Sequence, residues 1–447
     1  INKNTFQMNF LPNFTILKKH SGIRKYFSNT SWLLGERILR MGVSLFVGIY
    51  VVRFLGPEKF GLLSYAMSFV LLFGTIASFG LNEILVRELL QDKTQIKELL
   101  STAFFLKIVG FLMMGSIIIF ALQFTNDDKY THLMITIISL GIFFQSFNVI
   151  DCYFQSQVQS KYVVIVQFIQ LLITSLIKIF LILNKATLVW FAIVFMIDQA
   201  LLAILLLSIY RWKKEWFSVF SVKWELATQL FKDAWPLIFS GLMVSIYMKI
   251  DLIMIKEMLD VKAVGIYAAA VKLCEVLYIL PVVVMSSLFP AIVEARKNNL
   301  IVYRKQVYRI YEIMIGATAI VAIITMFLAD WIVYILYGSI YQEAAAILKI
   351  YIWAFVFVSL GVVSSKYLVA ENLEIYALYR SVVGAFINIT LNWYLIPIYG
   401  IKGAAFATLI TQIFVAYLFL FCFRSTRYNF WTVTSAFTFG LYKNKLQ

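Results

Sequence analysis

Long apolar runs constrain this chain more than any other feature. A helix needs about 20 mostly apolar residues to cross a bilayer, and twelve runs meet that requirement. They lie at residues 31–55, 60–83, 101–124, 131–154, 162–183, 187–210, 235–257, 264–290, 309–329, 344–369, 376–397 and 403–423. Runs such as LLITSLIKIFLIL are apolar on every side, whereas the strands of a membrane β-barrel alternate. The sequence therefore predicts an all-α polytopic membrane protein with about twelve transmembrane helices.

Composition excludes several other classes of protein. The chain is 62% hydrophobic and 14% charged, whereas soluble domains are about 45–50% apolar and about 25% charged. Its net charge of +16 comes from Lys and Arg that such an apolar chain keeps in loops, at helix ends or at functional points in the membrane. Nucleic-acid binding is therefore not indicated.

No signature of an enzyme is present in the sequence. The three Cys and two His are scattered, so neither a disulfide framework nor a metal site is indicated. A P-loop is missing, and no nucleophile, base and orienting group are brought together by their spacing. The short turns between helices are too small for the catalytic loop of a membrane glycosyltransferase or polymerase. We expect a protein without a cofactor that is not an enzyme.

The Lys and Arg of the loops predict orientation. Most of them lie in every second loop and in the two terminal segments, which by the positive-inside rule places both termini in the cytoplasm. The longest loop falls midway along the chain and mixes Trp with Lys, as interfacial segments do. The predicted organisation is a basic N-terminal segment (1–30), a six-helix lobe (31–210), a cytoplasmic linker (211–234), a second six-helix lobe (235–424) and a cytoplasmic tail (425–447).

A weak internal repeat relates the two predicted lobes. FLGPEKFGLLSYA after the first helix corresponds to MLDVKAVGIYAAA after the seventh, which aligns Gly61 with Gly265. A fainter copy, PIYGIKGAAFAT, opens the last helix. An offset of six helices keeps both copies in one orientation, so we expect parallel repeats with a substrate site between the lobes. Alternatively, small residues after a polar turn merely let helices pack closely.

Charged residues inside the apolar runs are the candidate functional residues, because a charge at the bilayer centre costs about 2.5–3.5 kcal/mol on insertion scales. Glu36, Arg37 and Arg40 share the first run. Glu36 can pair with Arg40 at i+4, which leaves Arg37 freer. These side chains could instead snorkel to the cytoplasmic surface.

The seventh run carries Lys249 and Asp251 near its middle. Two positions correspond to about 200° around a helix, so the two side chains face opposite ways. We expect one to line a cavity and the other to be bonded into the helix bundle. In the next run Lys272 and Glu275 are spaced to pair with each other, which would neutralise both.

Polar stripes mark the fourth and fifth runs. Asp151 lies on one of them and Lys178 on the other, and Asp198 adds a single carboxylate to the sixth run. Such stripes face protein or water rather than lipid. The intramembrane carboxylates Asp151, Asp198 and Asp251 could take up protons or bind sodium, or each could be neutralised by a nearby Lys. The surplus of Lys and Arg favours a cationic cavity for an anionic substrate.

Five segments of the sequence have a recognisable pattern. They are RFLGPEKFGLLSYAMSF, FGLNEILVREL, KIDLIMI, LPVVVMSSLFPAIVEA and, most specific, the stretch from SSKYLVAENLEIYALYR to NITLNWYLIPIYGIKGAAFATLI. These segments resemble those of Wzx-type O-antigen flippases, the polysaccharide biosynthesis membrane proteins of the multidrug/oligosaccharidyl-lipid/polysaccharide (MOP) exporter superfamily. The resemblance covers about residues 30 to 424. It implies two six-helix lobes that open alternately to the two sides of the bacterial inner membrane.

The resemblance also implies a substrate, an undecaprenyl-diphosphate-linked oligosaccharide moved from the cytoplasmic to the periplasmic leaflet. The polyprenyl tail would stay in the lipid bilayer, and polysaccharide polymerase or ligase machinery would take over the product. The candidate ligands of the diphosphate or sugar are Arg37, Arg40, Arg53, Lys178, Lys249 and Lys272. Arg53, which lies near the outer end of the first helix, could equally be an anchor.

Other exporters of the same superfamily remain alternatives. One is a transporter of teichuronic acid or another polysaccharide, and another is a cation-coupled drug exporter. A lumen that takes cationic drugs should be acidic, whereas the charge balance here is basic.

Overall fold

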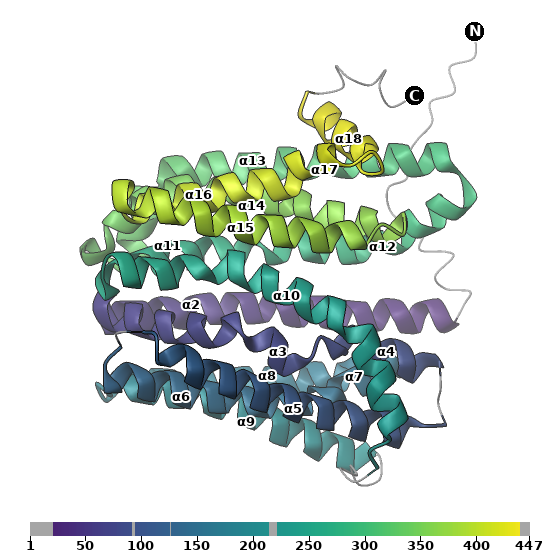
Figure 1. The fold of residues 1–447 in the computed structure, drawn as a ribbon, viewed down its shortest axis with the longest axis horizontal. Helices are drawn as coiled ribbons and strands as arrows, with labels where there is room; N and C mark the ends of the chain where they lie inside the picture. The colour runs from purple at the N-terminus through teal and green to yellow at the C-terminus, as the bar shows by residue number, and fades with distance from the viewer. Residues whose placement is uncertain (1–20, 92–93, 126, 214–220, 439–447) are drawn as a thin grey trace.

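The computed structural model describes residues 21–91, 94–125, 127–213 and 221–438, and the regular structure of these residues is helical (Figure 1). The first half of the chain supplies α2 (Ser21–Leu72), α3 (Gly74–Ser78), α4 (Leu81–Gln91), α5 (Ile96–Leu122), α6 (Lys129–Phe143), η1 (Phe144–Asn148), α7 (Val149–Ser156), α8 (Ser160–Leu183) and α9 (Leu188–Lys213). The second half supplies α10 (Trp224–Met258), α11 (Val261–Leu277), α12 (Ile279–Asn298), α13 (Leu300–Tyr337), η2 (Ser339–Tyr341), α14 (Glu343–Ala370), α15 (Ile375–Tyr399), α16 (Ile401–Ile413), η3 (Phe414–Leu418), α17 (Phe419–Cys422) and α18 (Arg427–Phe437).

Within the described residues, eleven helical stretches are long and apolar enough to cross a membrane. The first of them, Gly35–Leu72, includes most of the predicted run 31–55 and the first half of the predicted run 60–83. The chain reverses inside it at Gly56, whose φ of 69° and ψ of 171° are not helical, and Pro57 follows as the first residue of the returning helix. The prediction of a polytopic all-α membrane protein is therefore confirmed.

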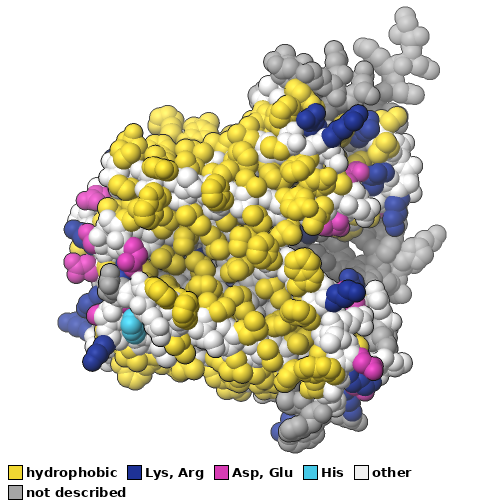
Figure 2. All heavy atoms as spheres, viewed as in Figure 1, with side chains coloured by type: hydrophobic (Ala, Val, Ile, Leu, Met, Phe, Trp, Pro, Cys, Tyr) yellow, Lys and Arg dark blue, Asp and Glu magenta, His cyan; other side chains and the backbone are white. Residues whose placement is uncertain are grey.

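The helices lie side by side in two lobes, the earlier helices in one and the later helices in the other (Figure 1). Figure 2 shows hydrophobic side chains across the middle of one face, with charged side chains gathered toward its two ends. This distribution is that of a protein whose long helices span a bilayer and whose loops lie in water. On the right of Figure 2 the surface is hollowed between the lobes.

The buried apolar side chains show where the lobes meet. One core cluster draws residues from both lobes, such as Val52 and Tyr65 of the first lobe and Tyr267 and Ile352 of the second. Toward the other end of the helices, each lobe has its own separate cluster. The lobes are thus joined at one end, which we call the closed end, and separate toward the other, the open end.

The two copies of the internal repeat contact each other at the closed end. A Cβ on Gly61 would lie 2.0 Å from the carbonyl oxygen of Val261, and a Cβ on Gly265 would lie 1.8 Å from that of Pro57. The contact is reciprocal, because each glycine faces the residue four positions before the other, as a two-fold axis requires. Both positions need glycine so that the two helix backbones can touch.

Two segments differ from their sequence-based description. Residues 214–220 of the expected linker lie outside the described residues, but from Trp224 onward that linker is the start of α10, where Ala227, Leu230 and Ala234 pack into the core of the first lobe. In the expected tail, α18 folds back, and its Val433 joins the core of the second lobe. Both helices form because their apolar residues recur at helical spacing. Residues 1–20 and 439–447 of the terminal segments lie outside the described residues.

Candidate functional site

An ion pair joins the lobes at the closed end. The Nζ of Lys256 on α10 lies 2.6 Å from Oδ1 of Asp127, whose side chain is 1% exposed. The hydroxyl of Tyr65 donates a hydrogen bond of 2.9 Å to the other carboxylate oxygen of Asp127. We call Tyr65, Asp127 and Lys256 the clamp. Beside it, the hydroxyl of Tyr341 donates to the carbonyl oxygen of Val52 at 3.0 Å and ties the lobes a second time.

Arg53 also lies at the closed end, apart from the other candidate ligands. Its guanidinium donates to the carbonyl oxygen of Ile335 on α13, and its side chain is otherwise exposed. This contact matches the role of an anchor between lobes. A role for Arg53 in substrate binding stays a prediction.

The centre of the interface carries charged side chains that are neither fully buried nor fully exposed. Lys249 of α10 pairs with Glu275 of α11 at 2.8 Å, and their side chains are 25% and 30% exposed. Glu275 therefore neutralises Lys249 rather than Lys272, its possible partner on its own helix. Lys272 instead extends over Gly48 and lies 5.5 Å from the centre of the Phe60 ring, so it reaches the first lobe.

The first lobe adds one more cation to this cluster. Lys178 of α8 is close enough to Lys272 for their charges to repel each other, and the carboxylate of Asp198 on α9 attracts its ammonium group. Asp198 accepts a hydrogen bond of 3.1 Å from Gln199 and is partly buried. The structure thus brings Lys178, Lys249 and Lys272 to one region between the lobes, as a lumen would require.

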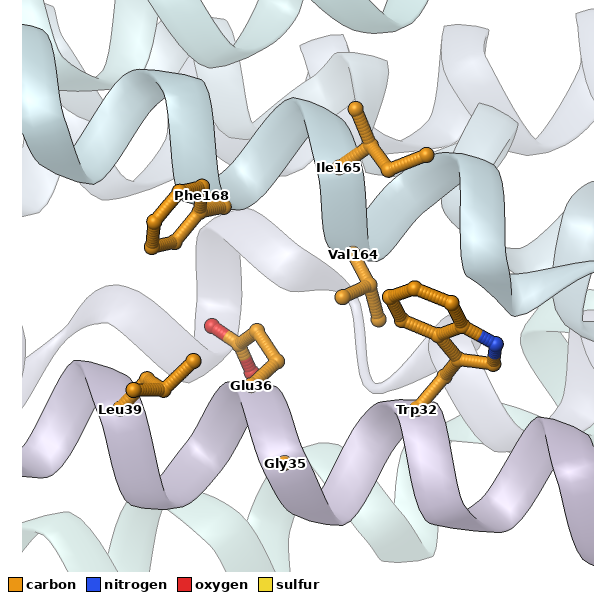
Figure 3. A pocket seen from close by; sticks show the side chains of 7 residues that line it. All are labelled: Trp32, Gly35, Glu36, Leu39, Val164, Ile165 and Phe168. Carbon is orange, nitrogen blue, oxygen red and sulfur yellow. The ribbon is translucent and has the colours of Figure 1, made fainter.

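Arg37 and Arg40 lie further toward the open end, on α2. Arg40 pairs with Glu36, as the i,i+4 spacing predicts, and approaches the carbonyl oxygen of Gln167 at 3.5 Å. Arg37 is exposed. A pocket of about 430 Å³ opens beside Glu36 between α2 and α8 (Figure 3). Figure 3 shows Trp32 and Glu36 pointing across it toward α8, and the other side chains in its wall are apolar, such as Leu39 and Phe168.

Asp251 is bonded into the second lobe. It is 3% exposed and accepts hydrogen bonds of 2.7 Å from Tyr267 and from Nδ2 of Asn392, and a further one from Thr408. Lys249 and Asp251 therefore face opposite environments, as their spacing predicts. Oδ1 of Asn392 and Nδ2 of Asn388 lie in the same buried network, and within the described part of the chain neither has a hydrogen-bond partner. The partners come from α11, α15 and α16, and sequence analysis did not foresee that they would converge.

A second polar region lies inside the first lobe. Asp151 accepts a hydrogen bond of 3.0 Å from Gln155 and lines a cavity of about 300 Å³, together with Asn82 and Glu83. Behind this cavity is Lys107, which is 1% exposed and donates to Oδ1 of Asn82 at 2.7 Å. Sequence analysis missed Lys107, although it stands alone in an apolar run and meets the criterion applied to the other buried charges.

The arrangement as a whole can hold an anion between two lobes. Lys178, Lys249 and Lys272 outnumber the nearby carboxylates of Asp198 and Glu275. The centre of the interface therefore keeps a net positive charge in a partly enclosed space, where charge-assisted hydrogen bonds are strong. The buried carboxylate of Asp251 lies on the other side of α10 and is separate from this cluster. One helix therefore presents a cation to the interface and an anion to the lobe interior.

Comparisons with known proteins place this architecture in a family. The model described as polysaccharide biosynthesis protein matches residues 27–296, more than half of the chain. The model described as MatE matches residues 236–394. None of the curated proteins matches the sequence.

Solved structures share the fold at low identity. The inward-facing conformation of a multidrug resistance MATE family transporter of the MOP superfamily has a TM-score of 0.70 at 14% identity, over 89% of this chain and 96% of that chain. The inward closed conformation of the lipid II flippase MurJ has a TM-score of 0.68 at 15% identity, over 92% of each chain. The outward-facing conformation of a multidrug resistance MATE family transporter has a TM-score of 0.59 at 14% identity, over 91% and 96%. This chain belongs to the polysaccharide biosynthesis protein family, and it shares its fold with solved transporters of the MOP superfamily.

Proposed function

We propose that the protein flips an undecaprenyl-diphosphate-linked oligosaccharide, the repeat unit of an O-antigen or a related polysaccharide, from the cytoplasmic to the periplasmic leaflet of a bacterial inner membrane. The cycle is alternating access, in which the open end and the closed end exchange roles. Both termini are then cytoplasmic, and a polymerase or ligase on the periplasmic side consumes the product.

The observation that carries the proposal is the convergence of Lys178, Lys249 and Lys272 from both lobes. A diphosphate needs cations that face it from more than one side, and a cluster shared by two lobes changes its geometry when the lobes move. Glu275 holds Lys249 and leaves Lys272 available for the anion. Arg37 and Arg40 lie toward the open end, where they meet an entering headgroup first.

Two further features support the proposal. The apolar pocket between α2 and α8 offers hydrocarbon contacts to a lipid tail beside the lumen (Figure 3). The TM-score is higher with the inward-facing than with the outward-facing MATE transporter, which agrees with assigning the open end to the cytoplasm. The positive-inside distribution of Lys and Arg favours the same assignment.

We propose that Asp251 couples transport to a monovalent cation. Its carboxylate lies beside the hydroxyl oxygens of Thr408 and Tyr267 and accepts a hydrogen bond from the amide of Asn392. A carboxylate with nearby hydroxyl oxygens suits a proton or a hard cation such as sodium. Asp151 and Asp198 are less suited, because Lys107 and Lys178 lie near enough to neutralise them.

Gene deletion and complementation test the main proposal. In the deletion strain we expect surface polysaccharide to disappear and undecaprenyl-linked repeat units to accumulate in the cytoplasmic leaflet. Wild type should restore export, and Lys272→Gln should restore it poorly at equal expression. The matched control is Lys402→Gln, which removes an exposed Lys at the start of α16 and should behave as wild type.

The alternative reading, a drug exporter, gives the opposite result. Unchanged surface polymer in the deletion strain, together with higher sensitivity to cationic drugs, would overturn the flippase proposal. Normal export by Lys272→Gln would remove this residue from the binding site while leaving the flippase assignment intact.

Ion coupling is tested by transport into vesicles under imposed sodium or proton gradients. Asp251→Asn keeps the size of the side chain but loses its charge, so we expect flux that no longer responds to either gradient. Asp330→Asn is the matched control, because Asp330 is exposed and pairs with Lys349 on the surface. An unchanged gradient response in Asp251→Asn would contradict the coupling role.

A further inference from the structure

Arg380 is a buried guanidinium with unused hydrogen-bond donors. It lies on α15, and it is 8% exposed. Its Nη2 donates to the hydroxyl of Ser365 on α14 at 2.8 Å, whereas its Nε and Nη1 have no hydrogen-bond partner among the residues that the structure describes. The guanidinium is always charged in proteins, so two charged donors point into the interior of the second lobe without an acceptor.

The described surroundings of Arg380 are uncharged. The ionisable groups near it are Tyr247 of α10 and Tyr311 of α13, and both are neutral at physiological pH. Among the described residues, no carboxylate forms an ion pair with this guanidinium. A buried charge without a counter-charge is strongly destabilising, so an anion from outside the chain would stabilise this site.

The site is enclosed by helices from three directions. The ring of Tyr247 packs against Gly384, one turn along α15 from Arg380. Tyr311 lies near Ser364, which accepts a hydrogen bond of 3.2 Å from Asn429 of α18. Ser364, Tyr311 and Asn429 are fully buried. Among the described residues, the hydroxyl of Tyr311 and the Nε and Nη1 of Arg380 are without partners, so they can donate hydrogen bonds to an anion.

We propose that Arg380 holds a small monovalent anion of the chloride type inside the second lobe, bound between α14 and α15. One guanidinium compensates one negative charge, so a diphosphate or a phosphate dianion would leave charge uncompensated in this enclosed place. The anion is thus distinct from the substrate headgroup at Lys272. The inference does not depend on what the protein transports.

The anion also has a structural consequence. Arg380, Gly384, Asn388 and Asn392 follow one another at every fourth position on the buried face of α15, and α10 packs along this face through Tyr247 and Asp251. A bound anion at Arg380 and the carboxylate at Asp251 would therefore lie at two levels along the same helix pair. Removing the anion should therefore loosen α10 against α15.

The test measures thermal stability of the purified full-length protein in detergent. Sodium gluconate is replaced by sodium chloride at constant sodium and ionic strength, and the Tm is followed by Trp fluorescence. We expect a saturable rise of a few degrees for the wild type and no rise for Arg380→Gln. The matched control Arg309→Gln removes an exposed Arg of α13 and should keep the full response.

Two further measurements keep the inference falsifiable if Arg380→Gln does not fold. Radioactive chloride should bind the wild type with one saturable site per chain, and Arg380→Lys should shift the chloride titration to higher concentration. The inference is overturned if chloride neither binds nor raises the Tm, if Arg380→Gln responds like the wild type, or if inorganic phosphate raises the Tm and chloride does not.

Discussion

The two lobes meet in two different ways. At the closed end the helix backbones touch through Gly61 and Gly265, whereas at the centre of the interface the long side chains of Lys178, Lys249 and Lys272 extend from their helices. A backbone contact either forms or does not, because it cannot adjust to an added atom. A cluster of flexible cations can adjust to cargo of different shape. The same interface therefore has a closed end that fits in only one geometry and a central binding region that can adopt several.

Gly265→Leu should have the largest effect. The new side chain would begin 1.8 Å from the carbonyl oxygen of Pro57, and backbone cannot yield as a flexible side chain can. We expect the closed end not to form and export to fall to the level of the deletion strain. Spin labels at the exposed positions 59 and 262 should report a longer distance than in the parent.

The matched control for this variant is Gly316→Leu, because no atom of the described residues lies within 4 Å of a Cβ built on Gly316. Its export should equal that of the wild type. If Gly265→Leu exports normally, the glycine contact is not part of the transport cycle.

Breaking the clamp should come next. Lys256→Met leaves the carboxylate of Asp127 buried without its cation, and loss of one partner of a buried ion pair costs about 3–5 kcal/mol. We expect a smaller fraction of the molecules to have the two lobes in contact at the closed end, and the same pair of spin labels measures this fraction. The double variant Lys256→Met with Asp127→Asn should recover much of it, because no buried charge then remains. An equal defect in both variants would argue against an electrostatic clamp.

The central cations should contribute less, and unequally. A hydrogen bond to a charged group is worth about 1.5–3 kcal/mol, which corresponds to roughly 10- to 150-fold in affinity. Lys272→Gln should weaken binding of undecaprenyl diphosphate to the purified protein within that range. Lys249→Gln should weaken it less, since Glu275 already neutralises Lys249. Tighter binding by Glu275→Gln would support this order, and equal losses in both Lys variants would contradict it.

Gly48→Ala should have the smallest effect. The new methyl group would lie 2.9 Å from Nζ of Lys272, which is the end of a flexible side chain and can move away. We expect a drop in affinity for undecaprenyl diphosphate of less than about tenfold, below 1.4 kcal/mol. A loss as severe as that of Gly265→Leu would show that the centre of the interface is as rigid as the closed end.

Much of the fold was accessible from sequence because the bilayer restricts spanning segments to helices of known length. The correspondence of Gly61 with Gly265 was visible, but their mutual contact was not, since a repeat does not reveal which faces meet. The chain reversal at Gly56 fell between two predicted runs, as the Gly-Pro pair suggests. The helical start of α10 was missed because Trp and Lys dominate that segment and conceal the spacing of Ala227, Leu230 and Ala234.

From the sequence, only those features of the site that lie within one helix could be predicted. Helical geometry placed Lys249 and Asp251 on opposite faces, and paired Glu36 with Arg40. It could not choose between Lys249 and Lys272 as the partner of Glu275, because one of those pairs crosses between helices. The partners of Asp251 come from three helices, and no spacing along the sequence brings them together.

The glycine contact on the two-fold axis also restricts how the two halves can change. A side chain added at either glycine would collide with the backbone of the other half. The sequence of one copy of the repeat therefore cannot change at this position independently of the other copy. The internal similarity around Gly61 and Gly265 is therefore held in place by mutual packing. Elsewhere, where each lobe packs on its own core, the halves are free to lose their likeness.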